Sequence, residues 1–453
     1  MSILRSLALT ATFLMTASAA DTLRIATFQA DVTPPLGAPL CCSGRVKPAT
    51  TIVSPLTARG IILFGSSKPI VMVAVDWVGI AGEGWDEWRL ALAKAAGTDA
   101  DHVTVNTVHP HDAPMYDPEA ERILAPIGQG GKIQNVPFVK VAIERTAKAV
   151  REAAAHSRPV THLGLGKGIV EKVASNRRLI GPDGKVWFGR MSSCKNAEAR
   201  NSPEGVIDPF LRSVSFWNGD QPVAVITFYA THPQSYYGQG GVNPDFPGIA
   251  RSTREAALPG VAHIHFNGAG GNVAAGKYND GSPEMRPVLA QRLTAGMEAA
   301  WKSTVKVPIG SRDVSWRSVR VALPLAKVLE DTVPLRNVIA DPEKPEIERR
   351  YTARSLAWAE ACKKGRQVPL FRLRLGSAAV LFMPGELFVE YQLEAQKLRP
   401  DGFVAMAAYG DIGPGYIGTR ITYSQGGYEA GPVSRTSPDV EDVLMRGMRE
   451  LLK

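Results

Sequence analysis

Cysteine is scarce in this chain, which has four among 453 residues, at positions 41, 42, 194 and 362. Their spacing matches no zinc–thiolate motif. Adjacent cysteines such as Cys41 and Cys42 rarely form a disulfide with each other, because the geometry is strained. At most two long-range disulfides are therefore possible, and the sequence does not decide among the pairings of the four thiols.

A membrane-spanning segment and a nucleic-acid-binding stripe are also missing. No apolar run is long enough to cross a bilayer, and Lys and Arg are scattered rather than interleaved with aromatic residues, although the formal charge is +9. The sequence therefore predicts no nucleic-acid partner. It indicates a solvated basic surface, with weak peripheral attraction to an anionic membrane as a minor alternative, and it leaves the oligomeric state open.

Residues 1–20 have the three regions of a secretory signal peptide. Arg5 gives the positive region, residues 7–15 form the apolar core, and Ala17-Ser18-Ala19 forms the small-residue cleavage pattern before Asp21. We therefore expect the mature protein to be secreted or periplasmic.

Residues 21–453 alternate strand patterns, loops rich in Gly and Pro, and helical patterns. Residues 57–64 and 70–75 have the β-branched runs of a hairpin, 138–154 has apolar positions at helical spacing, and 221–231 predicts a buried strand. We predict a single large α/β (mixed α+β) domain without internal repeats. Its mixed β-sheets are flanked by helices, and its active site lies on loops at strand ends.

Five polar side chains follow predicted strands of this domain: His109, His111, His232, Glu386 and Tyr416. Two imidazoles and one carboxylate with an open coordination position are the ligands of hydrolytic zinc sites. The alternative is that the histidines lie on the surface beside proline turns. The wide spacing cannot decide, because only the tertiary structure can bring such residues together.

Short motifs in a characteristic order extend along nearly the whole mature chain. They are Asp31-Val32-Thr33-Pro34, His109-Pro110-His111, Asn176-Arg177, His232-Pro233, Asn243-Pro244-Asp245, Gly270-Gly271-Asn272-Val273, Pro384-Gly385-Glu386, and Tyr416 followed by Tyr428-Glu429. By their number and order, the chain resembles the N-terminal catalytic domain of the neutral, non-lysosomal ceramidase family. These are zinc-dependent amidases of sphingolipid metabolism that cleave N-acylsphingosine into fatty acid and sphingosine.

The resemblance implies four ligands for Zn²⁺, namely His109, His232, Glu386 and Tyr416. Tyr423 is a competing candidate for the tyrosine ligand, but Tyr416 aligns without gaps when Tyr428-Glu429 is placed on the family's Tyr-Glu pair.

The resemblance also places three polar residues around the scissile amide, where they orient the carbonyl or donate to the developing oxyanion: His111, Arg177 and Tyr428. The alternative for Arg177 is a structural ion pair with Asp208 or Asp245. The alternative for Tyr428 is a packed ring with a satisfied hydroxyl.

The chain departs from the family in two places. Ala274 occupies the position of a family serine, which excludes a serine nucleophile there. The chain also ends soon after the catalytic core, so we expect the family's C-terminal β-sandwich domain to be absent, and this puts ceramide specificity in doubt. The loops 235–245 and 275–280, with Tyr236, Tyr237 and Lys277, form either a polar pocket for a hydroxylated substrate or surface turns.

These observations predict a secreted zinc hydrolase that cleaves the C–N amide bond of a ceramide-like lipid or another small N-acyl compound through zinc-activated water, with His111 as candidate proton shuttle. One alternative keeps the metal but changes the substrate to a more polar amide or an ester, such as a sugar derivative. Another is a non-catalytic relative that retains a structural metal.

Overall fold

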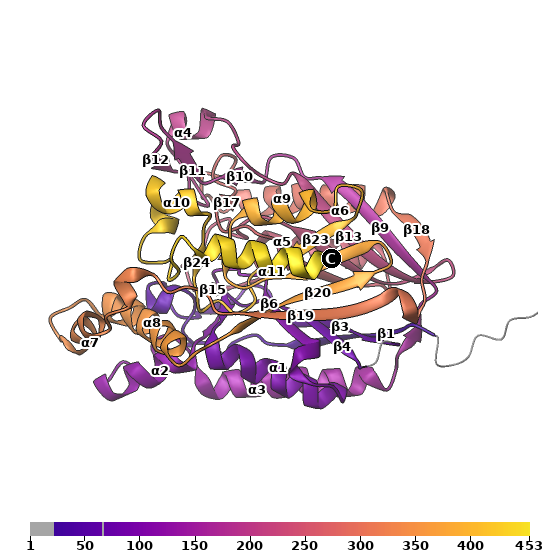
Figure 1. Cartoon of the computed structure of the whole chain (residues 1–453), viewed down its shortest axis with the longest axis horizontal. Coiled ribbons are helices and arrows are strands. Elements are labelled where there is room, and N and C mark those ends of the chain that lie inside the picture. Colours follow the sequence, from indigo (N-terminus) through magenta and orange to yellow (C-terminus); the bar gives the residue numbers. More distant parts are fainter. Residues whose placement is uncertain (1–21, 66–67) are drawn as a thin grey trace, which may run out of the picture.

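The computed structural model describes residues 22–65 and 68–453. The predicted signal peptide, residues 1–20, lies outside this part of the chain. Three large β-sheets and the helices that cover them make up most of the structure (Figure 1), so the predicted mixed α/β class is confirmed. Among the described residues, no helix combines the length and the apolar character needed to cross a membrane.

The first sheet has the strand order β6-β4-β3-β1-β8. Its first three strands in the chain are antiparallel, and a helical crossover leads to a parallel fourth strand. The elements are β1 Arg24–Asp31, β3 Thr57–Phe64, β4 Ile70–Val75, crossover helix α1 Gly82–Ala96, β6 Val103–Thr107, a second helix α3 Val136–Ala154 and the short edge strand β8 Arg158–Pro159. Helix α3 packs on β1, and α1 packs on β6.

The second sheet, β16-β14-β13-β9-β18, repeats this order of strands and helices. Its elements are β9 His162–Ile169, β13 Phe210–Asn218, β14 Gln221–Tyr229, α5 Asp245–Ala257, β16 Ala262–Asn267, α6 Met285–Lys302 and β18 Val305–Pro308. The third sheet, β19-β20-β21-β23, follows the same order to the end of the chain. Its elements are β19 Val314–Val321, β20 Val368–Leu375, β21 Ala378–Phe382, α9 Val389–Lys397, β23 Val404–Ala407 and α11 Val440–Leu452.

The chain therefore contains three copies of one topology, although its sequence shows no repeat. In each copy the third and fourth strands are parallel, so their carboxyl ends lie at the same edge of the sheet. In open sheets that contain parallel strands, ligands bind at this edge. The topology thus offers three pairs of strand-end loops from which one site can be built.

A common apolar core joins the three sheets, because buried side chains of β4, β16 and β21 belong to one packed cluster. In Figure 1, α1 and α3 lie along the lower side and α6 and α9 along the upper side, with the strands between them. The insertion α7 Val333–Ala340 and α8 Glu346–Lys363, between β19 and β20, projects at the left.

Short strands and helices lie within the loops around this core. The strands are β2 Thr51–Ile52, β5 Gly79–Ile80, β7 Met115–Tyr116, β10 Ser175–Asn176, β11 Arg178–Ile180, β12 Val186–Gly189, β15 Gly241–Val242, β17 Val273–Ala274, β22 Glu386–Leu387 and β24 Tyr416–Ile417. The helices are α2 Pro118–Leu124, α4 Ala197–Asn201 and α10 Arg420–Gln425.

Candidate metal centre

Loops from all three copies of the topology deliver the candidate ligands. His109 lies just beyond β6, and His232 just beyond β14. Glu386 and Tyr416 come from the third copy, where the short parallel strands β22 and β24 place them opposite each other. The structure thus brings together residues separated by up to about 300 positions in the sequence, as the ligand hypothesis requires.

The donor atoms of His109, His232 and Glu386 all lie within 4.8 Å of one another. The Glu386 carboxylate oxygen Oε2 is 3.0 Å from His232 Nε2 and 3.5 Å from His109 Nε2. The Tyr416 hydroxyl is 3.1 Å from His232 Nε2. The hydroxyl of Tyr423 instead contacts Thr436 at 2.9 Å, so the geometry favours Tyr416 as the fourth donor.

Backbone carbonyls orient both imidazoles. His109 Nδ1 bonds the carbonyl of Val78, and His232 Nδ1 bonds the carbonyl of Gly270 at 2.6 Å. With a proton on each Nδ1, the Nε2 lone pairs face the shared centre, which is the arrangement that metal-binding histidines use. His109 also has a left-handed backbone, with φ of 72°, a conformation that is costly for a residue other than Gly and is found at functional sites.

The charge states of His232 and Glu386 suit a divalent cation. Burial lowers the pKa of His232 to about 4, so this imidazole is neutral near pH 7. Burial by itself raises the pKa of Glu386, but His109 and His232 outweigh it and hold the pKa of this carboxyl well below its usual range. Two imidazole nitrogens beside an ionised carboxylate form a donor set that fits zinc.

Arg177 is buried beside Tyr416 and forms a structural ion pair, with a partner that we did not predict. Its Nη1 donates to the Tyr416 hydroxyl at 3.1 Å, and its Nε lies 3.0 Å from a carboxylate oxygen of Glu429. The aspartates considered as partners pair with other arginines, Asp208 with Arg212 and Asp245 with Arg286. Burial would lower the pKa of Arg177, but Tyr416 and Glu429 raise it, so this side chain is a fixed cation.

A cavity of about 820 Å³ opens beside the centre. Its wall includes Glu386, His111, Tyr428 and the basic residues Arg45, Lys327, Arg354 and Arg435. Most of its exposed surface is nevertheless apolar, as Val78, Leu329, Leu335, Ile412 and Val433 illustrate. Tyr428 is half exposed, and its ring lies 5.7 Å from that of Tyr416. His111 and Tyr428 therefore line the cavity, whereas Arg177 lies behind Tyr416 and contacts the candidate ligands.

The two polar loops mainly support the fold. Lys277 Nζ donates to the carbonyls of Arg200 and Ser202 at 2.7 and 2.6 Å, and the amide of buried Asn279 donates to the carbonyls of Ser192 and Ser235. Tyr237 is the exception among the residues considered, because its ring lies 4.6 Å from the ring of His111.

The position of the family serine lies in a buried strand. Ala274 in β17 is opposite Ser175 in β10, and the Ser175 hydroxyl donates to the Ala274 carbonyl at 2.8 Å. This hydroxyl is committed to the backbone, so it does not replace the missing nucleophile.

Three residues beside the centre were missed by the sequence reasoning as parts of a site: Cys41, Cys42 and Tyr409. The Tyr409 ring lies 4.7 Å from that of His109. Tyr409 lies just beyond β23, as His109 lies just beyond β6. This equivalence could have indicated Tyr409 as a site residue only if the strands were already known. The sequence shows that Cys41 and Cys42 are adjacent, but nothing in it places them near His111. All four cysteines of the chain are free thiols.

Solved structures that share this fold include two ceramidases. A neutral ceramidase from Pseudomonas aeruginosa matches with a TM-score of 0.71 and 18% identity, over 95% of this chain and 74% of that chain. A ceramidase complexed with C2 matches with a TM-score of 0.70 and 16% identity, over 95% of this chain and 75% of that chain. No protein-family model and no curated protein matches the chain. The predicted resemblance is thus confirmed at the level of structure, and the chain has the fold of the N-terminal portion of neutral ceramidase.

Proposed function

We propose that this protein is a zinc-dependent amidase that cleaves the C–N bond of N-acylsphingosine or a closely similar lipid amide, and that it acts after export from the cytoplasm. One observation carries the proposal. Two imidazoles and an ionised carboxylate converge at the wall of a cavity whose exposed surface is mainly apolar. A hydrolytic centre beside an apolar cavity suits a substrate with a polar amide and an alkyl chain.

The residues that would hold the ion are His109, His232, Glu386 and Tyr416. Zinc bound by such a set polarises a carbonyl and acidifies water near neutral pH. Burial raises the pKa of Tyr416, and the Arg177 cation 3.1 Å from its hydroxyl offsets part of this rise.

The two cavity-lining polar residues have different tasks. Burial raises the pKa of Tyr428 to about 12, so its hydroxyl keeps its proton and can donate a hydrogen bond to the substrate carbonyl oxygen. His111 Nε2 lies 3.4 Å from His109 Nε2, close enough to the centre to transfer a proton to the leaving amine.

The apolar cavity also favours a lipid amide over a sugar-derived substrate. A hydroxylated ligand needs several convergent polar groups, and the polar loops that were considered for this task are hydrogen-bonded to the protein itself. The fold shared with a ceramidase complexed with C2 supports the same choice.

The test compares wild type with Glu386→Ala, using zinc content and hydrolysis of a panel of N-acylsphingosines and N-acyl sugars. Losing a ligand is expected to weaken zinc binding by at least the roughly 10–100-fold that losing an outer-shell partner costs, and to abolish amide cleavage. Glu394→Ala is the matched control, since the half-buried Glu394 forms an ion pair with Lys397 on helix α9 and does not line the cavity.

Full zinc content in Glu386→Ala would show that the ligand set is wrong. Turnover of N-acyl sugars without turnover of any N-acylsphingosine by zinc-loaded wild type would reject the lipid substrate and leave the metal centre standing.

A further inference from the structure

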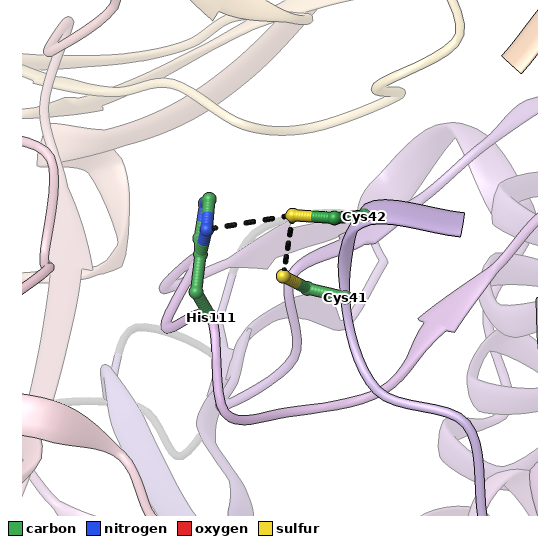
Figure 2. A group of neighbouring side chains, drawn as sticks. All are labelled: Cys41, Cys42 and His111. Carbon is green, nitrogen blue, oxygen red and sulfur yellow. Dashed lines mark hydrogen bonds between the residues drawn. The ribbon is translucent and has the colours of Figure 1, made fainter. Parts of the chain in front are cut away.

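A second group of metal-binding side chains lies next to the first centre. Cys41 and Cys42 stand at the start of the short 3-10 helix η2 (Cys42–Gly44), and His111 comes from the loop after β6. The two sulfurs are 2.6 Å apart, and the Cys42 sulfur is 3.8 Å from His111 Nδ1. Figure 2 shows the three side chains pointing toward one another, with the Cys42 sulfur between the other two groups.

The two sulfurs are closer together than unbonded sulfur atoms normally lie, and either a disulfide or joint binding of one ion would relieve this contact. A disulfide is one possibility, but it is strained here. Successive Cα atoms across a trans peptide are about 3.8 Å apart, whereas disulfides usually join Cα atoms about 4.4–6.8 Å apart. Cys42 already has a left-handed backbone, with φ of 61°, and closing an eight-membered ring would add to this cost.

We infer that Cys41, Cys42 and His111 form a second metal site, which takes a soft or borderline cation such as Zn²⁺ or Cu⁺. Two thiolates and one imidazole nitrogen are the donors that such ions prefer. The sulfurs must separate to about 3.8 Å to bind tetrahedrally at zinc–sulfur distances of about 2.3 Å. Cys41 is fully buried, but Cys42 lines the cavity and has room to rotate, and the same cavity gives an ion access.

His111 links this second site to the first. Its Nδ1 faces Cys42, while its Nε2 faces His109 at 3.4 Å and contacts the side-chain amide of Gln234. An ion on Nδ1 leaves the proton on Nε2. Rotating the Gln234 amide by a half turn then presents its oxygen to this proton and its NH₂ to Ser192, which keeps both groups paired. An ion in the second site thus fixes His111 as a hydrogen-bond donor to Gln234, so proton transfer by His111 at the first centre requires the second site to be empty.

The test is an anaerobic Co²⁺ titration of the reduced mature protein, followed by absorption spectroscopy. Thiolate ligands give Co²⁺ an intense near-ultraviolet charge-transfer band that nitrogen and oxygen donors do not give. We expect wild type to bind two equivalents and to show this band. Cys42→Ser should bind one equivalent without the band. Cys362→Ser, which removes a thiol far from the cluster in the sequence, should behave as wild type.

Glu386→Ala separates this inference from the proposed function. It should keep the thiolate band and lose the other equivalent, so failure of the first centre leaves the second measurable. Alkylation of wild type gives a readout without any variant, because bound ion should protect Cys42, which lines the cavity and should react in the metal-free protein. A reduced wild type without the band, a band that survives Cys42→Ser, or a Cys41–Cys42 disulfide that persists when ions are supplied during expression would each overturn the inference.

Discussion

Two residues with left-handed backbones hold aromatic rings against the candidate metal centre. His109 and Tyr409 have φ of 72° and 59°, and each lies just beyond the fourth strand of its sheet. The His109 amide donates to the carbonyl of Trp77, and the Tyr409 amide donates to the carbonyl of Gly385, both at 3.0 Å. A left-handed non-glycine residue costs roughly 1–3 kcal/mol and persists only where its surroundings fix it. The ring centroids of the two residues are 4.7 Å apart, so these left-handed backbones place a candidate ligand and the residue that packs on it.

A different buried histidine, His265 in β16, should control part of the acid sensitivity of the fold. Burial lowers its pKa to about 3, while the unfolded chain has a histidine pKa of about 6.5. Between these values the unfolded state binds the extra proton, so the free energy of unfolding falls as the pH falls. Lowering the pH from about 7 to about 5 should cost about 2 kcal/mol from this group alone.

Denaturant titrations of the metal-free protein at both pH values measure this effect. His265→Gln should reduce the loss by about 2 kcal/mol, whereas His156→Gln, at an exposed position, should leave it unchanged. Equal losses in wild type and His265→Gln would contradict the assignment.

Strand β9 shows how packing between elements can hide a strand from sequence reasoning. Its segment contains Gly164, Gly166 and Gly168 at alternate positions, and glycine is depleted in strands. All three face crowded surroundings: a Cβ on Gly166 would lie 2.0 Å from the carbonyl oxygen of Ala300, and one on Gly168 2.4 Å from that of Gly296, both in α6. The glycines let the helix approach the sheet, a role that strand propensity cannot reveal.

Gly166→Ala should therefore push α6 away from β9. Overpacking of this kind typically costs about 1–3 kcal/mol, and chemical denaturation measures it. Gly189→Ala in β12 is the matched control, because the nearest atom to an added Cβ is the Met191 sulfur at 3.5 Å. The control should have unchanged or slightly higher stability. Equal stability of the two variants would show that α6 can shift without cost.

Across the whole molecule, the sequence predicted the elements better than their assembly. The periodic segments β3 and β4 have the predicted bounds, 57–64 and 70–75, because β-branched runs and a turn define them locally. The three copies of one topology could not be predicted from the sequence, because the copies share their strand order but not a repeated sequence. The candidate ligands were chosen from strand ends and a resemblance, and their convergence at 4.8 Å required the tertiary structure. The thiol cluster could not be predicted, because its cysteines and histidine are about 70 positions apart.

The insertion in the third copy should set the length of substrate that the cavity accepts. Helix α8 contributes Thr352 to the wall of the cavity, which Glu386 and Tyr428 also line. Thr352→Trp would fill space used by an acyl chain. Displacing about two methylene groups costs about 1.6 kcal/mol, so kcat/KM for a long-chain N-acylsphingosine should fall roughly tenfold.

A short-chain N-acylsphingosine should lose little activity in the same variant, since its acyl group does not reach the filled space. Glu348→Trp, an exposed substitution on the same helix, controls for the added ring. The comparison of kcat/KM for the two chain lengths is decisive. Equal losses for both substrates would mean that Thr352 affects the centre itself, and no loss for either would mean that the acyl chain lies elsewhere.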